Sequence, residues 1–162
     1  MSGFISASSL RGLAAVLAAC LVATPVPASL LAFAAETPEP TAASEEGEIR
    51  LVLSLQESWY IYAPTGLNAA QGMIETAVEM TPSDHVQFAD AVFPAPRDRG
   101  GFSVLAGDQI VIIQPFRVRP RTEPGDYRVR GAIDYQTCDD EICLPPDRVE
   151  FTVTIRVQPA DN

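Results

Sequence analysis

A strict alternation of apolar and polar residues in three segments is the feature that most constrains how this 162-residue chain can fold. The alternation runs through Ile49 to Leu55, Tyr127 to Tyr135 and Val149 to Val157. A period of two puts the apolar side chains of a strand on one face, as in an antiparallel sheet with one buried side. Shorter apolar stretches, separated by turn-forming sequences, predict further strands at residues 59–62, 73–80, 86–88 and 109–118.

No segment shows the longer 3.6-residue period of an amphipathic helix. Hydrophobic residues make up 47% of the chain, which is enough for a packed core. We therefore predict an all-β fold, an immunoglobulin-like antiparallel β-sandwich, in one domain over residues 48–158. Residues 159–162 are expected to be a short tail.

The first 34 residues are typical of a cleaved export signal. Arg11 supplies a positive charge, residues 12–23 are apolar, and Ala32-Phe33-Ala34 forms an A-x-A cleavage pattern. The apolar run is too short to predict a transmembrane span, and we expect none in the mature chain. We predict a signal peptide at 1–34 and a periplasmic domain that begins near Ala35.

An alternative processing route remains open because Leu17-Ala18-Ala19-Cys20 has the form of a bacterial lipobox, in which Cys20 is lipidated. The residues after Cys20 stay apolar, however, whereas a lipoprotein tether is usually polar. Both routes place the domain outside the cytoplasm, where disulfides persist. Residues 35–47 are rich in Glu, Pro and small residues, and predict a solvated linker.

The charge of the chain excludes one class of partner. Twenty-one acidic residues against eleven basic ones give a net charge of -10. Nucleic acid carries the same sign of charge and would be repelled. A partner with a basic or apolar face stays compatible with this composition.

Cys138 and Cys143 are the residues that carry chemistry. They lie in a predicted loop between two strands, in the segment Tyr135 to Pro146. A disulfide that closes so small a ring contributes only about 2 kcal/mol to stability, and short, exposed disulfides are often the reactive ones. Most disulfides of exported domains are nevertheless structural, so the residues alone leave a redox pair and a structural staple equally open.

Three acidic residues, Asp139 to Glu141, lie between the two cysteines. Neighbouring carboxylates disfavour a thiolate and should raise the pKa of both thiols. That direction suits a carrier that receives electrons and passes them on, rather than an oxidant that inserts disulfides. The composition of an ordinary solvated loop is the alternative explanation for these acids.

The strings Y-Q-T-C-D-D-E-I-C-L-P-P and W-Y-I-Y-A-P resemble the amino-terminal periplasmic domain of the thiol:disulfide interchange protein DsbD. The resemblance spans residues 49–157 and implies an immunoglobulin-like fold. It also implies a reductase that receives electrons from a membrane-embedded thiol transporter by way of thioredoxin-like proteins, and reduces other exported thiol proteins. The best-known members have one more residue between the cysteines. Since transmembrane and thioredoxin-like parts are missing here, we expect a free-standing version.

The resemblance also implies the roles of individual residues. Cys143 is implied as the sulfur that exchanges with partners, and Cys138 as the one that resolves the mixed disulfide. Tyr60 and Tyr62 match aromatic residues packed beside the pair, and ordinary strand core is the alternative for both. Tyr135 opens the cysteine motif and is expected to support it. Phe102 lies where the family has a cap loop, but the family motif is not preserved in residues 97–102, which favours an ordinary turn there.

Other kinds of site have less support. His85 is the only histidine, lies in a turn-like segment and is expected to face solvent. Two cysteines and one distant histidine do not make a metal site, so we expect neither metal nor cofactor. The competing function is an exported immunoglobulin-like binding module whose disulfide is structural.

Overall fold

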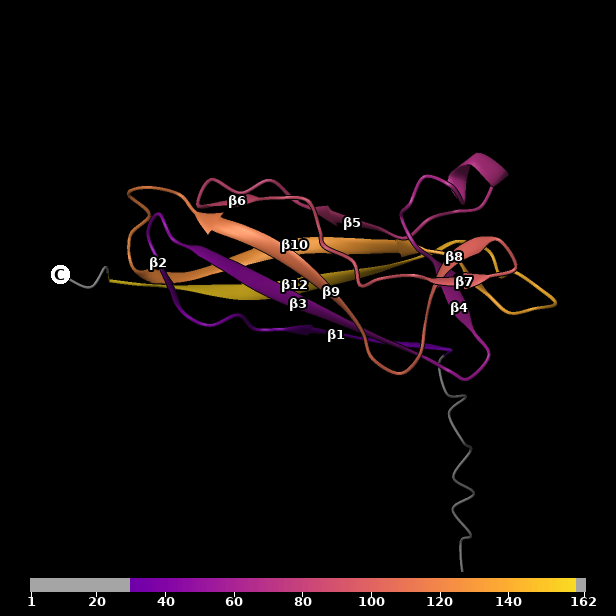
Figure 1. The fold of residues 1–162 in the computed structure, drawn as a ribbon. Coiled ribbons are helices and arrows are strands. Elements are labelled where there is room, and N and C mark those ends of the chain that lie inside the picture. The colour runs from indigo at the N-terminus through magenta and orange to yellow at the C-terminus, as the bar shows by residue number, and fades with distance from the viewer. Residues whose placement is uncertain (1–29, 160–162) are drawn as a thin grey trace, which may run out of the picture.

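The computed structural model describes residues 30–159, and its strands form two sheets packed face to face with a small third sheet at one end (Figure 1). The strands are β1 (Leu31–Glu36), β2 (Thr41–Ala42), β3 (Glu46–Leu55), β4 (Tyr60–Tyr62), β5 (Ala77–Met80), β6 (Val86–Phe88), β7 (Arg97–Arg99), β8 (Phe102–Ala106), β9 (Ile110–Val118), β10 (Gly125–Tyr135), β11 (Thr137–Cys138) and β12 (Asp147–Gln158). A single-turn 3-10 helix, η1 (Ala69–Gln71), is the only helical segment of this range.

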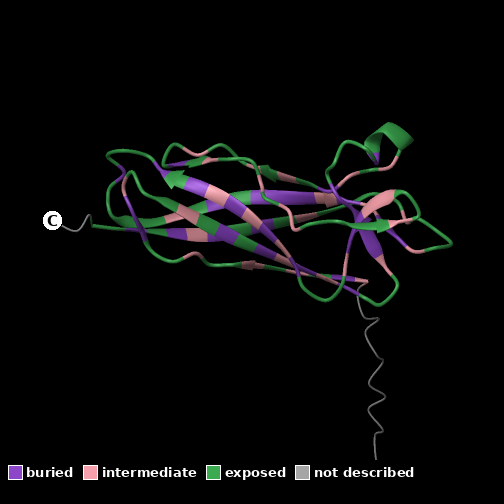
Figure 2. Ribbon diagram, viewed as in Figure 1, coloured by how far each residue is buried: buried purple, intermediate pink, exposed green. Residues whose placement is uncertain are grey.

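The two large sheets have the strand orders β1-β3-β9-β6 and β2-β12-β10-β5. All their pairings are antiparallel except that of β2 with β12. The core lies between them and draws its fully buried side chains from both sheets, among them Leu51, Ile112, Ile133 and Ile155. Figure 2 shows the resulting alternation of buried and exposed residues along the long strands.

The alternation in the sequence places these strands correctly. In β12, Phe151, Val153, Ile155 and Val157 are buried, while the residues between them face outward. β3, β9 and β10 follow the same pattern. The prediction of an all-β, immunoglobulin-like antiparallel sandwich is confirmed.

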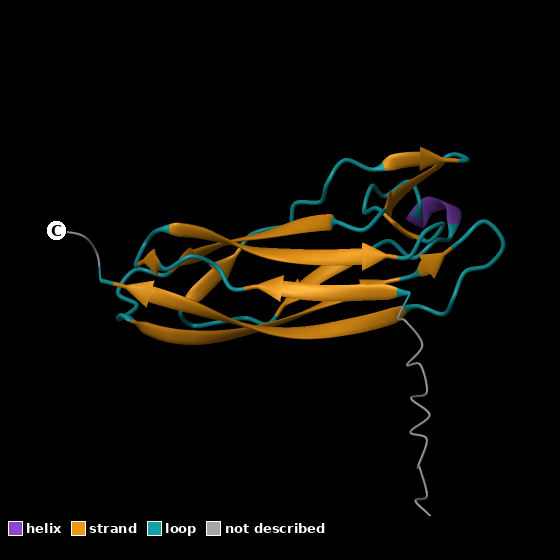
Figure 3. Ribbon diagram, turned by 90° about the horizontal axis from the view of Figure 1, so that it is seen from below, coloured by secondary structure: helices purple, strands orange, loops and turns teal. Residues whose placement is uncertain are grey.

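The third sheet, in the order β11-β4-β8-β7, covers one end of the sandwich (Figures 1 and 3). β4 lies at its centre, paired with β8 on one side and with β11 on the other. The loop that carries η1 lies at the same end (Figure 1). This end therefore gathers segments that are far apart in the sequence, and it holds both cysteines of the described residues.

The structure differs from the sequence-based expectation between residues 31 and 47. β1 pairs with β3 along its whole length, and β2 adds a short parallel edge to β12. Leu31 is buried, and Phe33 stacks on Phe151 with 5.6 Å between ring centroids. Alternating side chains in Leu31–Glu36 thus complete the sheet, whereas we expected the end of a leader and a solvated linker. The small residues that look like a cleavage pattern are equally suited to an edge strand.

Removing residues 30–34 is therefore expected to destabilise the domain. A chain that begins at Ala35 loses the buried Leu31 and the packing of Phe33, which together contribute about 2 kcal/mol or more. Denaturant unfolding of this chain and of one that begins at Leu30 measures the difference. Equal midpoints would show that β1 is dispensable and that a cut after Ala34 is compatible with the fold.

The remainder of the predicted leader, residues 1–29, and the last residues, 160–162, lie outside the described part. Cleavage of the leader and lipidation of Cys20 accordingly stay predictions. Across residues 30–159, no helix has the length and apolar character needed to cross a membrane.

Candidate functional site

The two cysteines close a short loop at the end of the sandwich. Cys138 and Cys143 form a disulfide, with 4.1 Å between their Cα atoms. Backbone bonds hold the same loop: the N–H of Asp139 donates to the carbonyl of Ile142 (2.9 Å), and the N–H of Leu144 donates to the carbonyl of Thr137 (2.9 Å). The two cysteines therefore face each other as a pair of antiparallel residues, in addition to their covalent bond.

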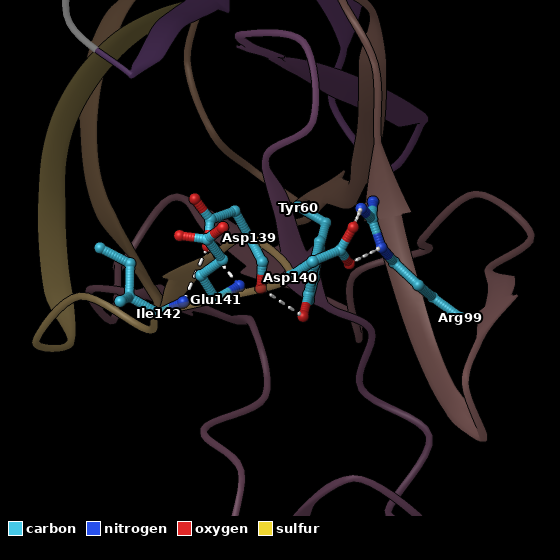
Figure 4. Close-up of polar contacts among 6 residues, drawn as sticks. All are labelled: Tyr60, Arg99, Asp139, Asp140, Glu141 and Ile142. Carbon is cyan, nitrogen blue, oxygen red and sulfur yellow. Dashed lines mark hydrogen bonds and ion pairs between the residues drawn. The ribbon is translucent and has the colours of Figure 1, made fainter.

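The side chain of Asp139 fixes the turn inside this ring. Its Oδ1 atom accepts the backbone N–H groups of Glu141 and Ile142, both at 2.8 Å (Figure 4). This is an Asx turn, a local arrangement that Asp favours. Asp139 thus has a structural role that the sequence did not indicate, since we expected it only to add negative charge.

The two cysteines differ sharply in exposure. Cys138 lies in β11, opposite Tyr60 of β4, and is 0% exposed. Cys143 follows the turn and is exposed. Cys143 is therefore the exposed residue of the pair, while Cys138 packs against buried side chains.

Three aromatic residues pack at the disulfide. Tyr60, Tyr62 and Phe102 belong to one small apolar cluster that also contains Cys138. The ring of Tyr62 meets the rings of Tyr60 and Phe102 edge-on, each at 5.7 Å between centroids. The structure thus brings all three side chains to one cluster with Cys138, while their supporting roles, and that of Phe102 as a cap, stay predictions.

Tyr62 makes a direct polar contact with the disulfide. Its hydroxyl lies 3.9 Å from Cys143 Sγ, and because a disulfide sulfur carries no hydrogen, the phenol is the donor. Burial, with a smaller contribution from the neighbouring Tyr60, raises the pKa of Tyr62 to about 12. A phenol is protonated at neutral pH even at its ordinary pKa of about 10. After reduction, the same O–H group is placed to donate to a thiolate at Cys143, which would favour the charged form.

Arg99 of β7 joins the β7–β8 hairpin to the ring. Its guanidinium donates from two nitrogens to the carboxylate of Asp140, at 2.9 and 2.8 Å, and lies 4.6 Å from the centroid of the Tyr60 ring (Figure 4). The guanidinium lowers the pKa of Asp140. One of the three ring acids is therefore neutralised, so the acids oppose a thiolate less than the sequence indicates. No local pattern in the sequence indicates this pair, because its two residues are 41 positions apart.

The turn of the β7–β8 hairpin consists of Gly100 and Gly101, both with positive φ (63° and 88°). Glycine adopts this conformation without the strain that other residues meet. The tight turn brings Phe102 back against Tyr62 immediately after Arg99 has reached Asp140. The hairpin therefore contacts the disulfide loop through Arg99 and the aromatic cluster through Phe102.

Tyr135 is placed differently from the other predicted site residues. Its side chain belongs to the main sandwich core, and its hydroxyl donates to Asp147 Oδ2 at 3.1 Å. Burial and the nearby Asp147 carboxylate raise its pKa to about 12. The neighbouring Gln136, which sequence reasoning overlooked, is the residue that reaches the disulfide loop, through a bond from its Nε2 to the Leu144 carbonyl (3.1 Å).

The loop that carries η1 is fastened to the site by a buried amide. Asn68 is 0% exposed; its Nδ2 donates to the carbonyls of Ala63 and Ser103, and its Oδ1 accepts the N–H of Ser103. Glu75 adds a second anchor, because its carboxylate accepts backbone N–H groups from residues 66, 68 and 69. Neither residue was singled out from the sequence.

Two further residues lie outside this cluster. His85 is exposed, as expected, and stacks on Tyr127 with 4.2 Å between ring centroids. Trp59 is partly buried against the main core. Within residues 30–159, no group of three or more Cys, His, Asp or Glu side chains is arranged to hold a metal ion.

Comparison with known proteins identifies the family to which the domain belongs. The sequence matches the family described as "Thiol:disulfide interchange protein DsbD, N-terminal" over residues 29–155, a range that includes β1, Cys138 and Cys143. The chain belongs to this family. As a member with a cysteine pair that forms a disulfide, it is a thiol–disulfide exchange domain.

Solved structures of similar proteins include the N-terminal periplasmic domain of ScsB from Proteus mirabilis, at 15% identity and a TM-score of 0.46. That similarity covers 78% of this chain but only 45% of the ScsB chain. The reduced DsbD N-terminal domain of Neisseria meningitidis has 17% identity and a TM-score of 0.43, covering 75% and 89% of the two chains. No curated protein matches the sequence.

Proposed function

We propose that the mature domain is a periplasmic thiol–disulfide reductase in which Cys143 exchanges with partner proteins and Cys138 resolves the mixed disulfide. The observation that carries these roles is the difference in exposure between an exposed Cys143 and a fully buried Cys138. Exchange requires one sulfur that a partner can reach in line and a second sulfur close enough to displace that partner.

The surroundings of each sulfur support the same division of roles. Tyr62 offers its hydroxyl to Cys143 rather than to Cys138, which favours a thiolate at the accessible position. Cys138 is packed among Tyr60, Tyr62 and Val104, where burial disfavours a free thiolate. Cys143 is thus the better nucleophile toward a partner, and Cys138 is protected from partners by its neighbours.

Electron flow is the second part of the proposal. The family membership supports a carrier that takes electrons from a membrane-embedded thiol transporter or a thioredoxin-like donor and passes them to other exported thiol proteins. The structure of the complex between the DsbD N-terminal and PilB N-terminal domains of Neisseria meningitidis records one partner of a similar domain. The similarity has 15% identity and a TM-score of 0.43, and it covers 74% of this chain and 80% of the solved chain.

Trapping with oxidised glutathione tests the assignment of roles. Reduced Cys138→Ser protein is expected to accumulate a stable glutathione adduct at Cys143, because no second thiol is present to release it. Reduced Cys143→Ser protein is expected to accumulate little, because its remaining sulfur is buried. Intact mass spectrometry at several reaction times measures both adducts, with the double Cys→Ser variant as the blank.

Equal adduct formation by the two single variants would contradict the assignment. The reduction potential then separates a reductase from a structural staple. Structural disulfides generally lie below about −300 mV, and we expect the Cys138–Cys143 pair to lie above that value. A lower potential, combined with no adduct in either variant, would favour the binding module with a structural disulfide.

A further inference from the structure

Ile142 is an exposed apolar residue on a rigid turn. Its side chain is 54% exposed, although it immediately precedes the exposed Cys143. Its backbone N–H donates to Asp139 Oδ1 and its carbonyl accepts the N–H of Asp139, so both polar groups of its backbone are bonded (Figure 4). The hydrogen-bonded turn therefore fixes the position of Ile142 while leaving it exposed to solvent.

Two other exposed apolar residues belong to the loop that carries η1, which lies at the same end (Figure 1). Among residues 30–159, four large apolar residues are exposed: Leu67, Ile74, Val92 and Ile142. The N–H of Ile74 reaches Gln136 Oε1 at 3.5 Å, and Gln136 in turn binds the backbone of Leu144, next to Cys143. Leu67 precedes Asn68, which is fastened to β8. We call Leu67, Ile74 and Ile142 the apolar rim.

The apolar rim is accompanied by negative charge. Glu141 lies between Asp140 and Ile142, is exposed, and takes part in none of the ion pairs formed among the described residues. Among the described residues Arg99 forms its ion pair with Asp140, so the carboxylates of Asp139 and Glu141, in the ring that Cys143 closes, take part in no ion pair. A complementary surface would carry apolar side chains against the rim and basic side chains against these carboxylates.

We infer that the apolar rim, with Glu141, is a docking surface for a disulfide-bearing protein whose reactive sulfur is surrounded by apolar and basic side chains. This inference rests on the proposed function and adds the chemistry of the preferred partner. Interfaces concentrate their binding energy in a few apolar anchors surrounded by polar residues, and Ile142 occupies such a position next to the exchanging sulfur.

The exchange that this docking serves is balanced in atoms and electrons. The thiolate of Cys143 attacks one sulfur of the partner disulfide; a Cys143–partner disulfide forms and the second partner sulfur leaves as a thiolate. The thiolate of Cys138 then attacks Cys143 Sγ and releases the first partner sulfur. The partner disulfide is reduced by two electrons, the Cys138–Cys143 pair is oxidised, and the two cysteine protons pass through water to the partner thiols.

Three synthetic disulfide-linked peptide dimers test the inference with the whole reduced domain. Their monomers are Arg-Phe-Cys-Leu-Arg, Glu-Phe-Cys-Leu-Glu and Arg-Ser-Cys-Ser-Arg. At low salt we expect the basic apolar dimer to react about tenfold faster than the acidic apolar one, and the difference to shrink at high salt. Chromatography of the released peptide thiol gives the second-order rate constants.

Matched variants identify the residues responsible. Ile142→Ala is expected to slow the basic apolar dimer about fivefold and to leave the basic polar dimer unchanged. Val92→Ala, which truncates an equally exposed apolar residue outside the rim, should change neither rate. Glu141→Gln should reduce the preference for basic over acidic peptides, whereas Glu150→Gln, an exposed acid on β12, should not.

The outcomes separate this inference from the function on which it rests. Equal rates for the three dimers, or equal effects of Ile142→Ala and Val92→Ala, would overturn the docking surface and leave the exchange chemistry intact. No release of thiol from any of the dimers would instead refute the proposed function.

Discussion

Replacing Asn68 with alanine is expected to lower the free energy of unfolding by about 2–4 kcal/mol. The amide is fully buried and makes three hydrogen bonds, at 2.8, 2.8 and 3.0 Å. The carbonyls of Ala63 and Ser103 keep other backbone donors after the substitution. The N–H of Ser103 loses its acceptor, and a cavity the size of the amide remains, so both desolvation and packing terms contribute.

Denaturant unfolding measures this loss, and Gln71→Ala is the matched control in the same loop. Gln71 is exposed and donates to the Leu67 carbonyl at 3.3 Å, so its truncation should change stability by no more than about 0.5 kcal/mol. A loss below about 1 kcal/mol for Asn68→Ala would show that the loop and β8 are held together by other contacts.

Replacing Gly131 with alanine is the second large effect, with an expected cost of about 2–3 kcal/mol. A Cβ atom at this position in β10 would lie 2.6 Å from Phe151 Cζ, 2.7 Å from Met80 Sδ and 2.9 Å from the carbonyl oxygen of Glu79. The Met80 side chain can rotate away. The Glu79 oxygen belongs to the backbone of β5, which is paired with β10, so β5 itself must move outward.

Gly125, at the start of the same strand, supplies the control. A Cβ atom there meets only Tyr127, at 3.8 Å and beyond, which is ordinary contact. Thermal unfolding of the two alanine variants should therefore differ by several degrees, with Gly131→Ala the lower. Similar midpoints for both variants would mean that β5 moves outward with no loss of stability.

The sequence predicted the parts of the fold that depend on local pattern. β3, β10 and β12 are long and one-sided, and their period of two is visible without any knowledge of partners. β1 was missed because its alternation uses Ala and Phe in a stretch that also satisfies an export signal. Periodicity cannot distinguish an edge strand from the end of an export signal, whereas the pairing of β1 with β3 shows that this stretch is a strand.

The residues of the candidate site also fall into two groups: those that a local motif indicates and those that only contacts between distant segments place there. The cysteines and the aromatics Tyr60 and Tyr62 follow from one motif and one strand. Arg99 and Asn68 depend on hydrogen bonds to Asp140 and Ser103, which are 41 and 35 positions away in the chain. Such contacts are set by the third sheet, and no local signal in a single sequence encodes them. Tyr135 was assigned to the site because it adjoins the motif, but the strand pleat turns its side chain toward the core.

The backbone bonds across the cysteine loop have a consequence for the proposed mixed disulfide between Cys143 and a partner. The Asx turn and the two cross-loop bonds do not depend on the sulfur–sulfur bond, so the loop is prepared to keep both thiols together after reduction. A nucleophile held this way has a high effective molarity toward its neighbour. The covalent intermediate with a partner should accordingly be brief, and turnover should be limited by how often partners meet rather than by how slowly they are released.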